Sequence, residues 1–296
     1  MAGRQIRIFL VDGTPNGIRS AEIINWTGAI LVVPRARLPE VANRREAIRT
    51  GVYCLVGPDP DYANRDKVYV GEGDNVFTRL VTHSKDATKD FWTIAVICVS
   101  KDENLTKSHG RYLESRLIAL ASTAARATLV NGNSPIGNPL PEADVSDMEY
   151  FLEQVQVIFP VLGLSFLQPV PSAAQQRIVF ENTDVGTHAR AIESDGEFVV
   201  LKGSTARKDG VPSWTTYKDL RDELLQAGKL RPNPNPDFLE FAEDVPFRSP
   251  SAAAAVVAAG NRNGRLMWRV EGTGQTYAEW QEARLAAAGV DTSDDD

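Results

Sequence analysis

A polar segment punctuated by proline divides the chain. Gln168–Arg177 contains two prolines among small and polar residues, and it directly follows the strongly apolar run Phe159–Leu167. Such a segment lacks the apolar side chains that would tie it to a core, so it is typical of a linker between domains. We expect folded regions at residues 1–167 and 178–290, a linker at 168–177 and a frayed acidic tail at 291–296.

The composition predicts a folded protein without contact with a membrane. Apolar residues make up 43% of the chain and charged residues 24%, which is typical of globular domains. The apolar run Ala252–Ala259 is far shorter than the roughly 20 residues of a membrane helix. The N-terminus lacks the apolar core of a signal peptide, and Cys54 and Cys98 lie in apolar runs that suit reduced, buried thiols. We therefore expect a cytoplasmic protein.

Charge is distributed unevenly along the chain. Lys and Arg outnumber Asp and Glu by 18 to 14 in residues 1–135, whereas Asp and Glu outnumber Lys and Arg by 25 to 14 in residues 136–296. The basic excess allows a local phosphate-binding patch but is weaker than that of a high-affinity DNA binder. The acidic half is suited to a protein partner. An asymmetry of this size also arises without function, so charge alone does not decide between these interpretations.

The first region predicts alternating strands and helices. Gly51–Val56 and Lys67–Gly71 are β-type runs separated by a Gly-, Pro-, Asp- and Asn-rich stretch, which indicates a hairpin with a long loop. Asp74 is expected to cap a helix over residues 75–83. Phe91–Ser100 follows as a buried strand.

Two longer helices are expected after that strand. Apolar residues spaced along 108–127 form one helical face, and a further helix is expected at about Ser146–Phe159. The order strand, strand, helix, strand, helix predicts an α+β fold with a small antiparallel sheet and flanking helices. The second region predicts a smaller α+β domain.

Six residues whose side chains could bind or cleave a substrate occur one after another on these elements. Two tripeptides, Gly51-Val52-Tyr53 and Tyr69-Val70-Gly71, lie on the two strands of the hairpin. They are followed by Arg79, His83, Glu114 and Asn131. Residues 49–135 thereby resemble the GIY-YIG nuclease family. We assign residues 49–140 to a GIY-YIG-type nuclease domain, residues 1–48 to an N-terminal extension packed on it, and 141–167 to a closing helix and apolar segment. The extension resembles that of one bacterial subgroup of the family.

The resemblance implies roles for these residues in phosphodiester hydrolysis. Glu114 would hold one divalent ion, Mg²⁺ or Mn²⁺, with the substrate phosphate completing its coordination. Arg79 would bind non-bridging phosphate oxygens through its planar fork. Tyr53 would relay a proton from the attacking water and Tyr69 would hold the nucleophile or phosphate, although which tyrosine is the base is left open. His83 would tune a tyrosine or touch phosphate.

Asn131, at the end of the helix that carries Glu114, is expected to bind substrate. Each residue also has an alternative interpretation as an ordinary packing or surface residue, because tyrosines on strands and Arg or His on a short helix are common. Glu72 departs from the family, in which many members carry a small, polar or basic residue. It would supply a second metal contact or repel phosphate. His109 is interpreted as a cap residue rather than a ligand.

The second region predicts a strand at Glu197–Lys202 and a helix at Tyr217–Ala227. A further helix is expected to be capped by Ser249 and to end at Gly260. A turn at Asn263-Gly264 should follow, before a strand over 265–270. The runs Phe198–Arg207, Ser249–Val257 and Asn263–Trp268 resemble a domain family of unknown function found at the C-terminus of GIY-YIG and restriction-related proteins. Within them, basic, hydroxyl and aromatic residues would form a ligand or nucleic-acid surface, or merely shape a turn and a core: Lys202, Ser204, Arg207 and Trp268.

The leading hypothesis is a divalent-metal-dependent endonuclease that acts on nucleic acid, with DNA the expected substrate, in restriction, mobile-element or repair biology. The alternative is a GIY-YIG scaffold that binds nucleic acid or protein with weak or no turnover. The nuclease hypothesis predicts that Tyr53, Tyr69, Arg79 and Glu114 converge on one accessible surface, because both helices are expected to pack on the paired strands.

Overall fold

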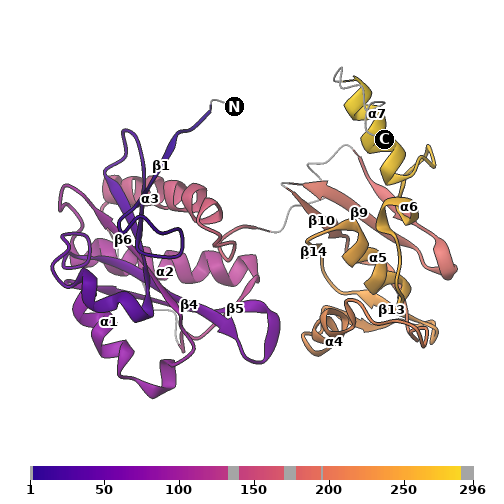
Figure 1. The fold of residues 1–296 in the computed structure, drawn as a ribbon, viewed down its shortest axis with the longest axis horizontal. Coiled ribbons are helices and arrows are strands. Elements are labelled where there is room, and N and C mark those ends of the chain that lie inside the picture. The colour runs from indigo at the N-terminus through magenta and orange to yellow at the C-terminus, as the bar shows by residue number, and fades with distance from the viewer. Residues whose placement is uncertain (1–2, 133–139, 170–177, 195, 288–296) are drawn as a thin grey trace. The chain divides into compact units, whose positions relative to one another are not determined.

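The computed structural model describes residues 3–132, 140–169, 178–194 and 196–287, and the side chains of Ala63 and Asn64 are not included. The chain divides into two compact units, residues 1–169 and 170–296 (Figure 1). Both units combine helices with sheets, so the expected α+β class is confirmed. Of the expected linker, residues 170–177 lie outside the described residues, as does the acidic tail 291–296.

A seven-stranded sheet forms the centre of the first unit. Its strands lie in the order β1-β2-β3-β6-β4-β5-β7, and neighbouring strands are antiparallel except for the parallel pair β5 and β7. The strands are β1 (Ile6–Leu10), β2 (Arg19–Ile23), β3 (Gly28–Pro34), β4 (Gly51–Asp59), β5 (Tyr62–Gly73), β6 (Ile94–Ser100) and β7 (Ala127–Leu129). Because β6 lies between β3 and β4, the N-terminal strands β1–β3 extend the same sheet, while the segment after β3 packs on one of its faces.

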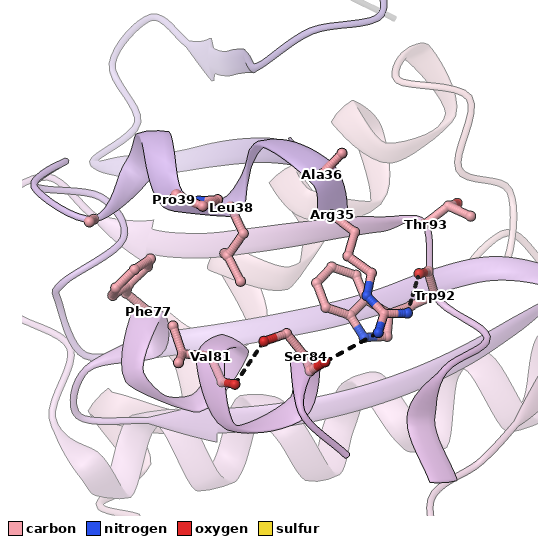
Figure 2. A pocket seen from close by; sticks show the side chains of 10 residues that line it. Arg35, Ala36, Leu38, Pro39, Phe77, Val81, Ser84, Trp92 and Thr93 are labelled. Carbon is pink, nitrogen blue, oxygen red and sulfur yellow. Dashed lines mark hydrogen bonds between the residues drawn. The ribbon is translucent and has the colours of Figure 1, made fainter. Parts of the chain in front are cut away.

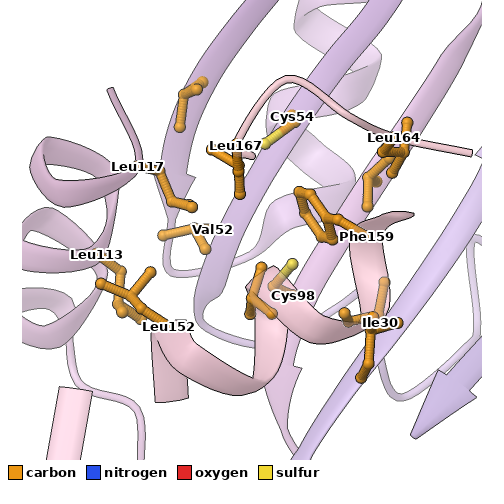
Figure 3. Close-up of a cluster of buried hydrophobic side chains, with 14 of the residues drawn as sticks. Ile30, Val52, Cys54, Cys98, Leu113, Leu117, Leu152, Phe159, Leu164 and Leu167 are labelled. Carbon is orange, nitrogen blue, oxygen red and sulfur yellow. The ribbon is translucent and has the colours of Figure 1, made fainter. Parts of the chain in front are cut away.

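Helices cover both faces of this sheet. On one face, α2 (Lys107–Ala124) and α3 (Glu142–Val161) bury the even-numbered β4 residues, including Val52 and Cys54, in a core that also contains Leu113 and Phe159 (Figure 3). On the other face, α1 (Val76–Ser84) and the 3₁₀ helix η1 (Arg35–Val41) cover the odd-numbered residues. Side chains alternate across a strand, so consecutive residues of β4 enter different cores. A short 3₁₀ turn, η2 (Ala87–Lys89), leads towards β6.

Three expectations for this unit are corrected. The hairpin has no long loop, since pairing continues to Asp59 and Tyr62 through an irregularity at Pro58, where a proline is tolerated. The cap of α1 is Asn75 rather than Asp74, and its side chain accepts a hydrogen bond from Thr78 N at 3.1 Å. Strand β7 was not expected. Cys54 and Cys98 are buried and free, as expected.

The second unit consists of two sheets around a buried helix. Helix α5 (Pro250–Ala258) consists of small apolar residues and shares one core with both sheets. The five-stranded sheet has the order β14-β10-β9-β8-β15 and the three-stranded sheet β11-β13-β12. Their strands are β8 (Phe180–Asn182), β9 (Ala189–Ser194), β10 (Glu197–Val200), β11 (Thr205–Arg207), β12 (Leu230–Pro232), β13 (Phe238–Phe241), β14 (Val245–Phe247) and β15 (Arg269–Val270). The remaining helical elements are η4 (Asp184–Gly186), α4 (Lys218–Gln226), α6 (Gly264–Met267) and α7 (Tyr277–Ala287).

Most expected elements of this unit are present, with one correction. Ser249 caps α5 through a 3.1 Å bond from Ala252 N, and Pro250 occupies the first helical position, as expected. Asn263 does not form a hairpin turn, however. It caps the short helix α6, and only Arg269–Val270 is strand. Gly264 allows this arrangement, because a β-carbon there would collide with the backbone of Pro250. Across the described residues, no helix is long and apolar enough to span a membrane.

Candidate active site

The two motif tripeptides lie side by side in the sheet. Strands β4 and β5 pair so that Tyr53 faces Gly71. A β-carbon at Gly71 would lie 2.5 Å from Tyr53 Cζ, so only glycine leaves room for the ring. Likewise, a β-carbon at Gly51 would lie 2.6 Å from Cys98 O on β6. Both motif glycines are therefore required by close packing around Tyr53 and β6.

Tyr53 on β4 and His83 on α1 form a buried pair between the sheet and the helix. The Tyr53 hydroxyl and His83 Nε2 share a hydrogen bond of 2.7 Å, and the two residues are 0% and 5% exposed. Burial lowers the pKa of His83 to about 4, with the charges of Lys89 and Arg79 acting in the same direction. Burial also raises the pKa of Tyr53 above its ordinary value. Both groups are therefore neutral near pH 7.

Tyr69, on β5, lies beside this pair and is partly exposed. Its ring centroid is 5.1 Å from that of His83 and 6.4 Å from that of Tyr53. The Lys89 ammonium lies 4.7 Å from the centre of the Tyr69 ring and forms an ion pair with Asp86 at 3.2 Å. Of the two motif tyrosines, Tyr69 is thus the one open to solvent.

Arg79 reaches the same place from α1. Its side chain passes over Gly73, where a β-carbon would lie 2.7 Å from Arg79 Cγ. Its guanidinium opposes the rise in the pKa of Tyr53 through charge and proximity to the hydroxyl. Because Arg79 is otherwise exposed, its planar fork is accessible to an anion.

Glu114 approaches from α2, which covers the opposite face of the sheet from α1. Both helices pack on the paired strands, as expected, but on opposite faces of the sheet, because the chain crosses the sheet through β6 between them. The expected convergence of Tyr53, Tyr69, Arg79 and Glu114 on one accessible surface stays a prediction. The charge of Glu114 nevertheless acts on Tyr53, and that of Arg79 acts on Glu114, so these side chains lie near one another. Burial raises the pKa of Glu114 to about 7, the charge of Glu72 adds to this rise, and Arg79 and Arg111 oppose it.

Asn131 fixes the outer edge of β5. Its side-chain oxygen accepts a hydrogen bond from Val70 N at 3.0 Å, and its amide nitrogen donates to Val70 O at 2.8 Å. The side chain thus replaces the strand that would continue from β7, whose pairing ends at Val68. This placement makes Asn131 a positioning residue for Tyr69 and Gly71; its expected contact with substrate stays a prediction.

His109 is a cap residue, as expected. Its backbone N–H donates to Thr106 Oγ1 at 3.3 Å and its Nδ1 accepts from Thr106 N at 3.2 Å, which closes a capping box at the start of α2. Its other ring nitrogen lies 3.3 Å from Asp144 on α3. His109 therefore fixes the orientation of the helix that carries Glu114.

The residues singled out in the second unit separate into two kinds. Ser204 accepts a bond from Arg190 N and donates to Arg190 O, and the buried Trp268 donates to Pro250 O, so both shape the fold. Lys202 is exposed and Arg207 is partly exposed, which leaves both accessible to a ligand. They belong to a different unit from Tyr53 and its neighbours.

Lys89 and Arg111 also belong to the first-unit site, although the motif spacing did not single them out. Lys89 lies in a short turn between α1 and β6, and Arg111 lies one turn before Glu114. The Arg111 spacing on α2 was the one available signal, since residues three apart on a helix are neighbours.

A pocket of about 860 Å³ lies on the other flank of α1, away from these residues. It is lined by Leu38, Phe77, Val81 and the ring of Trp92, with Arg35 stacked 4.9 Å from that ring (Figure 2). The Arg35 guanidinium donates to the carbonyls of Ser84 and Asp90. None of the motif side chains lines this pocket, so its size does not mark it as the site of chemistry.

Comparison with known proteins gives a match within the second unit. Residues 178–281 match a domain of unknown function, DUF4357. The match covers about a third of the chain and agrees with the expected C-terminal domain. No curated protein and no solved structure matches the chain. The GIY-YIG resemblance of residues 49–135 therefore depends on the motif residues alone.

Proposed function

We propose that this protein is a divalent-metal-dependent endonuclease of the GIY-YIG type, with DNA as its expected substrate. The proposal depends on one observation. Tyr53 packs against Gly71, Arg79 passes over Gly73, and Glu114 lies near enough that its charge acts on Tyr53, so a phenol, a guanidinium and a carboxylate lie near the same end of β5. Phosphodiester hydrolysis needs a proton acceptor, a cation facing the phosphate and a site for a metal ion.

Exposure assigns the roles within this set. Arg79 is open to solvent and binds the non-bridging phosphate oxygens. Tyr69 is the accessible phenol that meets the attacking water. Tyr53 is fully buried and hydrogen-bonded to neutral His83. This pair packs next to Tyr69 and Arg79, and it provides a route for the proton that Tyr69 takes from the attacking water. The water oxygen forms a bond to phosphorus while one phosphorus–oxygen ester bond breaks.

The donor set fits a hard divalent ion. Glu114 is half-buried, and beside it Glu72 has a buried carboxylate oxygen without a hydrogen-bond partner. No group of three or more His, Cys, Asp or Glu in the described parts of the chain could hold a metal, so water and phosphate must complete the coordination. Mg²⁺ characteristically binds through one or two carboxylates plus substrate phosphate. When bound, the ion would acidify a coordinated water and offset charge on the phosphate.

One observation favours the alternative of a binding module with little turnover. The family's first tyrosine is 0% exposed, so it reaches substrate only through Tyr69 or a rearrangement of α1. Binding without chemistry would need only Arg79 and neighbouring cations. The two functions are distinguished by whether phosphodiester bonds are cut.

A plasmid-nicking assay tests the proposal. Wild-type protein with Mg²⁺ or Mn²⁺ should nick supercoiled DNA, and EDTA should stop the reaction. Glu114→Gln should reduce the rate by about 10²–10³ while DNA affinity stays similar or rises, because the carboxylate itself repels phosphate. Arg79→Ala should lower both rate and affinity, because its fork contacts phosphate before and during the reaction.

Matched controls separate these effects from charge changes in general. Glu153→Gln, on the exposed side of α3, and Arg45→Ala, exposed after η1, should leave the nicking rate unchanged. All four variants should melt like the wild type. A wild-type protein that binds DNA but cuts neither DNA nor RNA with either ion would refute the nuclease and favour the binding module.

A further inference from the structure

Glu72 is a carboxylate whose surroundings in the described structure leave it incompletely satisfied. Its side chain is only 18% exposed, and its Oε2 atom is buried without a hydrogen-bond partner. The ion pair that is present is long, with 4.0 Å between Glu72 Oε1 and Arg111 Nε, and Arg111 is itself 46% exposed. Removing a carboxylate from water without a close partner is unfavourable.

The position of Glu72 relative to α2 shows what could satisfy it. A β-carbon at Gly110 would lie 3.6 Å from Glu72 Cβ and 3.7 Å from Glu72 Oε2, so the carboxylate lies directly against the first turn of α2. Glu114 is four residues further along, on the same face of the helix. Glycine inside a helix is unfavourable by about 1 kcal/mol relative to alanine. At Gly110, Glu72 packs at ordinary contact distance against the face of α2 that carries Glu114 one turn further on.

The neighbouring cations do not complete this pair. Asp74, two residues after Glu72, has its own ion pair with Lys107 at 2.9 Å. Arg79 and Arg111 act on the two carboxylates through their charges, but the ion pair between Arg111 and Glu72 joins only one oxygen, at 4.0 Å. The two partly buried carboxylates lie near enough that the charge of Glu72 raises the pKa of Glu114.

We propose that Glu72 and Glu114 together hold the divalent ion, so that the metal has two protein carboxylates rather than one. This inference takes its purpose from the proposed nuclease function, but its test does not depend on cleavage. Two carboxylates balance the charge of Mg²⁺ or Mn²⁺ and provide a site that binds the ion before nucleic acid arrives. Arg111 then pairs with the outer oxygen of Glu72 and orients it.

Mn²⁺ binding to the full-length protein, without nucleic acid, tests the inference. The electron paramagnetic resonance signal of free Mn²⁺ decreases as the ion binds, which gives an affinity for each variant. Wild type should show one saturable site. Glu72→Gln and Glu114→Gln should each weaken binding at least about tenfold, since ligand charge sets the affinity of such sites. Asp74→Asn, a nearby exposed carboxylate already paired with Lys107, is the matched control and should bind like wild type.

Melting of the ion-free proteins provides a second readout. Glu72→Gln keeps the shape of the side chain and removes a repelling charge, so its N-terminal unit should melt no lower than wild type. Added Mn²⁺ should raise the melting temperature of wild type much more than that of the variant. Wild-type Mn²⁺ affinity in Glu72→Gln, or no saturable site in wild type, would overturn the inference.

Nicking measured in parallel distinguishes the two proposals. A protein that binds Mn²⁺ through both carboxylates but cuts no nucleic acid keeps the metal inference and loses the nuclease. A protein that cuts DNA, while Glu72→Gln binds Mn²⁺ as tightly as wild type, keeps the nuclease and loses the role of Glu72.

Discussion

Replacing Gly71 with alanine tests whether the space beside Tyr53 determines the integrity of the site. The new methyl group would lie 2.5 Å from Tyr53 Cζ, well inside van der Waals contact. A flexible surface side chain would move aside. Tyr53 cannot do so easily, because it is 0% exposed and its hydroxyl is bonded to His83 at 2.7 Å. The strain must therefore move the ring away from His83, shift β5, or both.

The magnitude follows from the behaviour of overpacked cores. Inserting a methyl group into a well-packed site typically costs about 1–3 kcal/mol. In a unit of this size, each kcal/mol lowers the melting temperature by about 2–4 °C, so we expect a fall of about 2–12 °C in the N-terminal unit. Cleavage should fall as well, since Tyr69 and Arg79 pack around the same ring.

Calorimetry of the full chain should show the shift in the N-terminal transition alone. The chain contains three histidines, so the imidazole ¹⁵N resonances are few enough to assign, and those of His83 should change as its bond to Tyr53 weakens. Gly132→Ala is the matched control, because a β-carbon there meets nothing within 4 Å. Wild-type melting together with unchanged His83 resonances in Gly71→Ala would refute this reasoning.

Two further predictions concern buried ionisable groups. The folded-state pKa of His83 is about 4 against 6.5 in a model compound, so the unfolded state takes up its proton first as pH falls. Neutral His83 therefore contributes up to about 3 kcal/mol to the free energy of unfolding above pH 6.5. This contribution is lost as the pH falls from about 6.5 to about 4. Denaturation of His83→Gln over this range should show a correspondingly flatter pH dependence, and equal slopes in both proteins would contradict it. Arg221 is 3% exposed and donates to the carbonyls of Val256, Arg207 and Lys208. Arg221→Met leaves these carbonyls without a donor and should destabilise the C-terminal unit by about 3 kcal/mol or more, visible as a lowered second melting transition with the first unchanged.

The elements that carry the motif could be predicted because their patterns are strong. The apolar run ending at Ser100 and the face of α2 around Leu113 and Leu117 each bury continuous apolar surface. Short or irregular pairing was not predictable in the same way. Strand β7 has only three residues, too few to show a period, and the pairing of β4 with β5 continues past Pro58, a residue that usually indicates a loop.

The motif residues of the candidate site were proposed from sequence, but Lys89, Arg111 and the arrangement of the side chains were not. Tyr53 and Tyr69 lie on the same face of the sheet, yet one is sealed under α1 and the other is partly open. That difference depends on where α1 packs, which no local pattern encodes. The same is true of α1 and α2 lying on opposite faces, and of Gly110, whose close approach to Glu72 is a tertiary contact between elements far apart in sequence.

The central position of β6 has a consequence for how the protein is made. This strand pairs with β3 on one side and β4 on the other. The backbone groups on the inner edges of β3 and β4 therefore stay unpaired until residues 94–100 have been synthesised. During synthesis, β3 and the β4–β5 hairpin leave the ribosome with apolar edges unpaired, which exposes them to association with other chains. Insertion of β6 between them should therefore be the committed step of folding. Slow synthesis just before residue 94 would be expected to increase aggregation rather than assist folding.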